Sequence, residues 1–166
     1  MIKIFDSTCH PTVSGKFNGL ESNFKLLNSE MKKNNIYKAC AMGLDNFENY
    51  SHFKFIQETK KYENLIPIAG FNPMQSKRQI IQELEYIKKL GFKGVKIHNR
   101  ISNFSIADKK FKIFLEAFEK FDLVCLICCY WHSELDKYPN EDFLYSLVKA
   151  FKGVKNIKTI LIHGGN

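Results

Sequence analysis

The chain has 166 residues, of which 45% are hydrophobic and 14% aromatic, with nine Gly and four Pro. This composition excludes a disordered or fibrous protein, and it predicts one domain, residues 1–166, with a hydrophobic core. The 25 Lys and Arg residues exceed the 17 Asp and Glu residues, which gives a net charge of +8. No apolar run approaches the roughly 18–20 residues that span a bilayer, so no membrane partner is predicted.

The basic residues do not form a nucleic-acid-binding pattern. Only Arg78 and Arg100 are arginines, and the lysines are scattered along helix-like segments, whereas a nucleic-acid site needs a basic stripe with interleaved aromatic residues. No nucleic-acid partner is therefore predicted. The five cysteines are odd in number and lie mostly in apolar runs, which favours reduced thiols. With no signal-peptide pattern at the start of the chain, a cytoplasmic protein is the expectation.

Apolar runs of strand length alternate with amphipathic helical stretches along the whole chain. Strands with one helix between each pair predict βα units, and nearly continuous apolar strands indicate a parallel sheet covered on both faces. The predicted strands are residues 2–8, 37–44, 65–73, 93–99, 123–131 and 157–165, and the predicted helices are residues 20–34, 48–62, 76–90, 104–121 and 140–152.

Local signals support several of these helices. The fourth has an apolar face, because four apolar residues from Phe111 to Phe118 follow the i, i+3, i+4, i+7 spacing. Ser76 and Asn140 are suited to cap the N-termini of the third and fifth helices. Gly91 stands where the third helix should end.

Two architectures fit this order of elements, a doubly wound open sheet and a TIM-type (β/α) barrel. No glycine-rich nucleotide-binding motif follows the first strand, which weakens the open-sheet alternative. Polar residues instead lie at the C-terminal ends of many strands, as in a barrel; they are Asp6, Thr8, His10, Asn72, Lys96, His98, Cys128 and His163. We therefore predict an α/β fold of the TIM-barrel type. A complete barrel has eight βα units, so this chain supplies about six and is incomplete at its C-terminus.

Three segments resemble the amidohydrolase superfamily of metal-dependent TIM-barrel hydrolases, and within it the decarboxylase-like branch. The segments are DSTCHP after the first strand, GFKGVKIHNR around the fourth and LIHGG at the sixth. The resemblance implies a divalent metal ion, with zinc as the first choice, at the mouth of the barrel. It also implies that the metal site is degenerate, because Thr8 replaces the first His of the family's His-x-His pair. The family's final Asp is absent from this chain.

The resemblance assigns the metal ligands to His10, His163 and Cys128. Two imidazoles and a thiolate are good zinc ligands, whereas the hydroxyl of Thr8 is a poor one. A metal held there would lower the pKa of a bound water or polarise a substrate carbonyl.

Strand alternation places Lys96 and His98 on one face of the fourth strand, and Asp6 and Thr8 on one face of the first. Catalytic roles are predicted for Lys96, His98 and Asp6. An unpaired ammonium in a barrel interior is costly, so Lys96 requires either Asp6 or an anionic substrate as its partner.

Four residues around these strand ends are predicted to bind substrate. Arg100 is suited to orient a carboxylate or phosphate group, and Asn72 ends the third strand. Trp131 and His132 open the long loop after the fifth strand, where they could form a substrate rim.

The resulting prediction is an amidohydrolase-like, metal-dependent hydrolase or decarboxylase that acts on a small polar, anionic substrate. One alternative is a metal-free or inactive barrel of this type that serves as a binding protein, and another is a fragment without activity of its own. Because a six-stranded half-barrel exposes apolar strand edges, the missing units come either from a longer chain or from another copy in a homo-oligomer.

Overall fold

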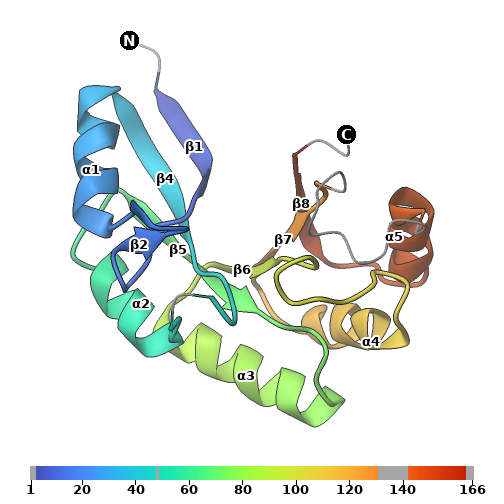
Figure 1. The fold of residues 1–166 in the computed structure, drawn as a ribbon. Coiled ribbons are helices and arrows are strands. Elements are labelled where there is room, and N and C mark those ends of the chain that lie inside the picture. The colour runs from blue at the N-terminus through green and yellow to red at the C-terminus, as the bar shows by residue number, and fades with distance from the viewer. Residues whose placement is uncertain (1–2, 48, 131–141, 164–166) are drawn as a thin grey trace.

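The computed structural model describes residues 3–47, 49–130 and 142–163. Six parallel strands form one curved sheet with helices α1–α5 on its convex side (Figure 1). The strands of this sheet are β1 (Ile4–Cys9), β4 (Ile36–Met42), β5 (Leu65–Phe71), β6 (Gly94–Ile97), β7 (Val124–Cys128) and β8 (Lys158–Ile162). The helices are α1 (Phe24–Lys33), α2 (His52–Thr59), α3 (Lys77–Leu90), α4 (Lys109–Phe118) and α5 (Phe143–Phe151), and a separate hairpin contains β2 (Lys16–Phe17) and β3 (Leu20–Glu21).

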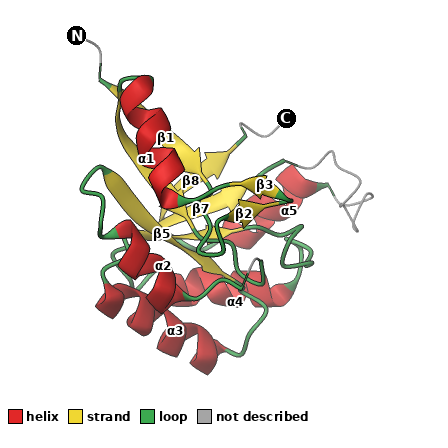
Figure 2. Ribbon diagram, turned by 60° about the vertical axis from the view of Figure 1, so that its left-hand side comes forward, coloured by secondary structure: helices red, strands yellow, loops and turns green. Residues whose placement is uncertain are grey.

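The strands of the sheet are ordered β1-β4-β5-β6-β7-β8, so each one pairs with the next along the chain. A doubly wound sheet would instead reverse direction at a switch point and carry helices on both faces. Here the helices lie on one side only, as Figure 2 shows in red against the yellow strands. The predicted partial barrel with six strands is therefore confirmed, and the open-sheet alternative is excluded.

The predicted helix-capping signals are largely confirmed. Ser76 accepts the Gln79 backbone N–H, and the Gln79 side chain accepts the Ser76 N–H in return, which forms a capping box at α3. Gly91 ends that helix at φ 98°, a left-handed conformation that glycine adopts without strain. Asp142 caps α5, while the predicted cap Asn140 lies outside the described residues.

The first predicted helix begins too early, because residues 16–21 form the β2–β3 hairpin. Asn18 and Gly19 form its two-residue turn, with φ values of 49° and 81°. Positive φ at both positions defines the type I′ turn, for which Asn-Gly is strongly preferred. Helix α1 starts only after Asn23, whose side chain caps it.

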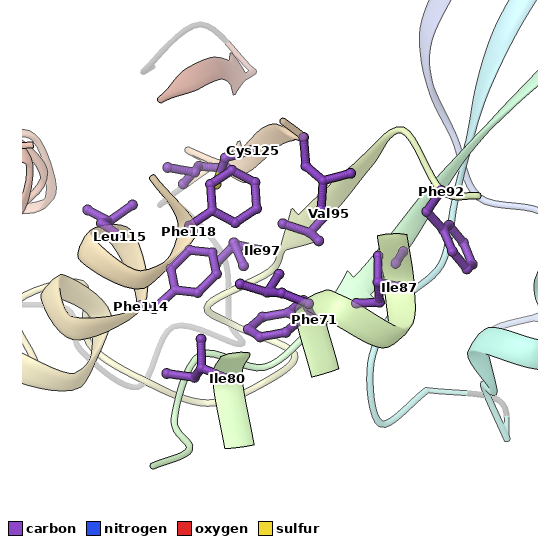
Figure 3. Packing of buried hydrophobic residues seen from close by; sticks show 14 of the residues in the cluster. Phe71, Ile80, Ile87, Phe92, Val95, Ile97, Phe114, Leu115, Phe118 and Cys125 are labelled. Atoms are coloured by element: carbon purple, nitrogen blue, oxygen red, sulfur yellow. The ribbon is translucent and has the colours of Figure 1, made fainter. Parts of the chain in front are cut away.

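Alternation along the strands divides the core into two layers. The larger cluster fills the space between the sheet and the helices and includes Val95 and Ile97 of β6 (Figure 3). A smaller apolar cluster lies on the other face of the sheet, where it contains Cys40, Met42, Ile68, Leu126 and Ile162. Since neighbouring residues of a strand point to opposite faces, Lys96 lies on this second, inner face. All five cysteines are free thiols, as predicted.

The two edge strands carry exposed apolar side chains. Phe5 on β1 is 52% exposed and Leu161 on β8 is 46% exposed, which confirms the expectation for an open half-barrel. Within the described residues, no helix is long and apolar enough to cross a membrane.

Candidate functional site

Lys96 lies fully inside the mouth of the partial barrel. It belongs to β6, between Gly70 of β5 and Leu126 of β7 in the parallel ladder. Its side chain is only 1% exposed, whereas the neighbouring His98 and Arg100 at the end of the strand are half-buried. The strand register predicted from the sequence is confirmed at this position.

The ammonium group of Lys96 has no hydrogen-bond partner among the described residues. Burial lowers the pKa of Lys96 to about 8, with Arg100 lowering it further, while Cys128 and Cys129 oppose the shift. Asp6, the predicted partner, instead accepts the Thr8 backbone N–H at 2.9 Å. Within the described part of the chain, the positive charge of Lys96 is therefore left for a ligand to neutralise.

Arg100 connects the ends of β6 and β7. Its Nη2 donates to Cys128 Sγ at 3.7 Å, and its guanidinium carbon lies 4.9 Å from the centre of the Tyr130 ring. The Tyr130 ring in turn meets the His163 ring edge-on, with 5.7 Å between their centres. These contacts join residues that follow three neighbouring strands, so the polar groups of this edge form one connected cluster.

Cys128 is fully buried at the end of β7. Burial raises the pKa of its thiol, but Lys96, the Tyr130 backbone N–H and Arg100 together outweigh burial, so the pKa lies below its ordinary value. Cys125 and Cys129 belong to the helix-facing cluster, and burial raises the pKa of each. Among these three cysteines, Cys128 alone has a surrounding that favours the thiolate.

His10 and His98 are two neutral imidazoles near Lys96. Burial lowers the pKa of His10 to about 4, assisted by the charges of Lys96, His98 and His163. Burial, Lys96 and Arg100 lower the pKa of His98 to about 3. Among the described residues, His10 Nε2 has no hydrogen-bond partner, while His98 Nδ1 accepts the Ile101 N–H at 3.4 Å. Both rings can therefore accept a proton when an anion offsets the neighbouring cations.

The expected alternation of Asp6 and Thr8 is interrupted by a β-bulge. Asp6 pairs with Ala39 and Cys9 with Ala41, so three steps along β1 match two steps along β4. An extra residue bends the strand and breaks the strict two-residue period. Simple alternation therefore does not establish that Asp6 and Thr8 share a face, and both this placement and the catalytic role of Asp6 stay predictions.

The predicted substrate-binding residues are placed unequally. Arg100 lies within the cluster, as described above. Asn72 follows β5, and its side-chain oxygen accepts the Met74 N–H at 2.9 Å, an Asx turn that shapes the loop. Trp131 and His132 lie outside the described residues, so their predicted roles stay predictions.

The predicted metal ligands were compared with the donor groups at the mouth. Among the described residues, no three His, Cys, Asp or Glu side chains are grouped so that they could hold a metal ion. His10, His163 and Cys128 thus do not form a ligand set, and the unpaired ammonium of Lys96 adds positive charge beside them. The arrangement does not fit a divalent cation. The described residues therefore do not support the predicted metal site, and no step below depends on a metal.

The sequence analysis missed a network of hydrogen bonds beside the site. Tyr50 OH accepts the Gly70 N–H at 3.0 Å and donates to His52 Nδ1 at 2.8 Å, and His52 Nε2 donates to Glu83 at 2.9 Å. A Cβ on Gly43 would lie 2.1 Å from the Tyr50 ring, so a glycine is needed there. This network joins the ends of β4 and β5 next to Lys96. No local motif in the sequence marks it.

Comparisons with known proteins support the fold. No family model and no curated protein matches the sequence. Among solved structures, an uncharacterised TIM-barrel protein from Bordetella bronchiseptica matches with a TM-score of 0.75 at 13% identity, over 99% of this chain and 68% of that one. The 5-carboxyvanillate decarboxylase from Sphingomonas paucimobilis matches with a TM-score of 0.69 at 13% identity, over 97% and 67%.

A putative amidohydrolase from Staphylococcus aureus also matches, with a TM-score of 0.67 at 13% identity, over 96% of this chain and 67% of that one. These likenesses confirm the predicted TIM-barrel fold. The chain spans about two thirds of each of these three structures.

Proposed function

We propose that this chain carries the anion-binding site of a barrel enzyme that hydrolyses or decarboxylates a small carboxylate-bearing substrate. One observation carries the proposal: the buried ammonium of Lys96 lies at the carboxyl ends of the strands without a hydrogen-bond partner among the described residues. In TIM barrels, these strand ends are where the active site lies. A buried cation is costly unless it is paired, and a substrate carboxylate supplies the missing charge.

The neighbouring groups suit the same substrate. Arg100 presents a planar guanidinium that can bind a carboxylate through two parallel hydrogen bonds. Its contacts to Cys128 and Tyr130 fix the guanidinium at the mouth. The bound carboxylate would also raise the pKa values of His10 and His98 towards neutrality, because it offsets the cations that lower them. Either imidazole then becomes a better proton-transfer group.

Support for hydrolysis or decarboxylation comes from the barrels of the same fold. The matched structures include a decarboxylase and a putative amidohydrolase. A binding protein is the second candidate, because Thr8 stands where the resemblance places a metal-ligating His and the described residues form no ligand set. The two candidates differ in one measurable property, which is turnover of the bound acid.

Calorimetric titration with a small dicarboxylate such as succinate tests the anion site. Lys96→Met should weaken binding by at least about tenfold, on the scale of losing one partner of a buried charge pair. The matched control is Lys93→Met, which removes an exposed lysine three residues earlier on the same segment and should leave binding unchanged. Equal binding by the wild type and both variants would refute the anion site. Binding without turnover of any carboxylic acid tested would favour the binding-protein candidate.

A further inference from the structure

We infer that Lys96 forms a covalent imine with the carbonyl carbon of a small 3-oxo acid, so that the site decarboxylates its substrate. This inference rests on the proposed anion site and names its substrate class. It goes beyond charge pairing, because it assigns the lysine a bond-forming role. The supporting observations are the burial of the amine, its lack of a hydrogen-bond partner among the described residues, and the cation beside it.

The surroundings of Lys96 favour the uncharged amine. The side chain is 1% exposed, and its ladder neighbour Leu126 belongs to the inner apolar cluster. With a pKa of about 8, roughly one amine in ten is uncharged at about pH 7, against roughly one in three thousand at the ordinary value of 10.5. Desolvation and a neighbouring cation are the two conditions that activate a lysine as a nucleophile.

Two residues of this cluster, Arg100 and Lys96, suit different ends of the substrate. A guanidinium is a permanent cation in proteins, whereas burial lets the amine of Lys96 lose its proton. The guanidinium therefore suits the carboxylate, and the amine suits the carbonyl carbon. His98 and Arg100, which follow Lys96 in the chain, are only half-buried, so a small acid would approach the buried amine from this end of β6.

In hydrolysis a neutral amine can act only as a general base, whereas in the decarboxylation of a 3-oxo acid it is the nucleophile. The uncharged amine attacks the carbonyl carbon and a C–N bond forms. One proton is taken up from solvent and the former carbonyl oxygen leaves as water, which gives a protonated imine. The adjacent carboxylate then leaves as CO2, and the electrons of the broken C–C bond move into the imine to give an enamine. One proton from solvent adds to the carbon that lost CO2.

Water finally hydrolyses the protonated imine, which releases the ketone, returns to solvent the proton taken up when the imine formed, and restores the uncharged Lys96 amine. The sum is one 3-oxo carboxylate and one proton converted to one ketone and one CO2. Nothing is oxidised or reduced overall, so the residues of the site and water suffice.

Trapping with sodium cyanoborohydride tests the imine directly, because this reagent reduces protonated imines to stable amines. The chain is incubated with acetoacetate and the reagent, digested, and mapped by mass spectrometry. The peptide containing Lys96 should gain the mass of the acid less one oxygen atom, or that mass less CO2. Labelling of Lys96 should exceed that of the exposed Lys93 by at least about tenfold, because far more of its amine is uncharged. 3-Hydroxybutyrate, which lacks the carbonyl, should give no label.

Lys96→Arg separates this inference from the proposed function. The guanidinium keeps the positive charge but stays protonated, so the variant should retain succinate binding and lose the trapped adduct. If the wild type binds succinate through Lys96 yet Lys96 is labelled no more than Lys93, the imine is refuted and the anion site stands. If neither Lys96-dependent binding nor trapping is seen, both are refuted. Lys93→Met, the matched control, should leave both signals intact.

Discussion

Lys96→Met should make the fold more stable at neutral pH, because it removes a buried charge without changing the side-chain length much. The pKa of Lys96 is about 8 in the folded protein against an ordinary value of 10.5. At about 1.4 kcal/mol for each tenfold change in the equilibrium, this difference corresponds to a penalty of about 3 kcal/mol at neutral pH. A gain of about 1–3 kcal/mol is expected, since Met also has to fit the space.

The pH dependence distinguishes this cause from better packing. Between pH values of about 8 and 10.5, the unfolded chain holds the Lys96 proton while the folded chain has lost it. Wild-type stability should therefore rise with pH through this window, and the advantage of the variant should shrink. The penalty is complete below about pH 8 and absent above about pH 10.5.

Chemical denaturation across this pH range measures both effects, and thermal melting should show an increase of about 2–4 °C for each kcal/mol in a chain of this size. Lys93→Met, at an exposed position, should change the free energy of unfolding by less than about 0.5 kcal/mol. If Lys96→Met were no more stable than the wild type at neutral pH, or if its difference from the wild type did not vary with pH, the ammonium would not be desolvated. The argument from burial would then be wrong.

Three further predictions concern the surroundings of the site. The pKa values of about 4 for His10 and about 3 for His98 lie below the ordinary 6.5, so stability should fall as pH drops from about 6.5; His98→Asn should reduce this loss in denaturation curves measured at acid pH. Tyr50→Phe removes the hydroxyl that accepts the Gly70 N–H and should cost about 1–3 kcal/mol, and an unchanged unfolding midpoint would contradict the network. Ser76→Ala removes the capping box of α3 and should cost about 1 kcal/mol, measured by urea denaturation, with Ser76→Asn restoring most of it.

The sequence was sufficient to predict the sheet because its signals are periodic and repeated. Apolar runs alternate with amphipathic helices, and the position of polar residues at many strand ends distinguishes a barrel from an open sheet. The observed strand order confirms this reasoning. The orientation of Lys96 also follows from alternation. Its neighbours Val95 and Ile97 face the helices, so Lys96 faces the inner side of the sheet.

Two local errors have different causes. Asn18-Gly19 is a strong signal for a hairpin turn, but no hairpin was predicted there and the first helix was begun at residue 20, inside the second strand of the hairpin, so this feature was predictable and was missed. The bulge between Asp6 and Cys9 is different, because an extra residue in a strand leaves no composition signal in a short polar segment. The face of a residue beyond such a bulge cannot be read from spacing alone.

The site was harder to predict than the fold because it depends on contacts between distant segments. His52 is hydrogen-bonded to Glu83, 31 residues away in the sequence. In the same way, the absence of a carboxylate beside Lys96 within the described residues could not be deduced from the sequence, where Asp6 was an available partner. The packing of distant segments decides which charged groups meet, and a local sequence pattern does not contain this information.

The free-energy cost of burying the Lys96 ammonium indicates which ligands suit the mouth of the partial barrel. Leu126 and the other apolar side chains of the inner cluster could pack against a hydrophobic residue, which would avoid the desolvation of an ammonium. Among the described residues no group offsets this cost, so a ligand that pairs with the cation or bonds to the amine would recover it. A carboxylate offsets the charge of the protonated Lys96, whereas a ketone carbonyl reacts with the uncharged amine that desolvation favours. An acid that carries both groups would use both properties, and this is the chemical basis on which we infer a 3-oxo acid rather than a simple carboxylate.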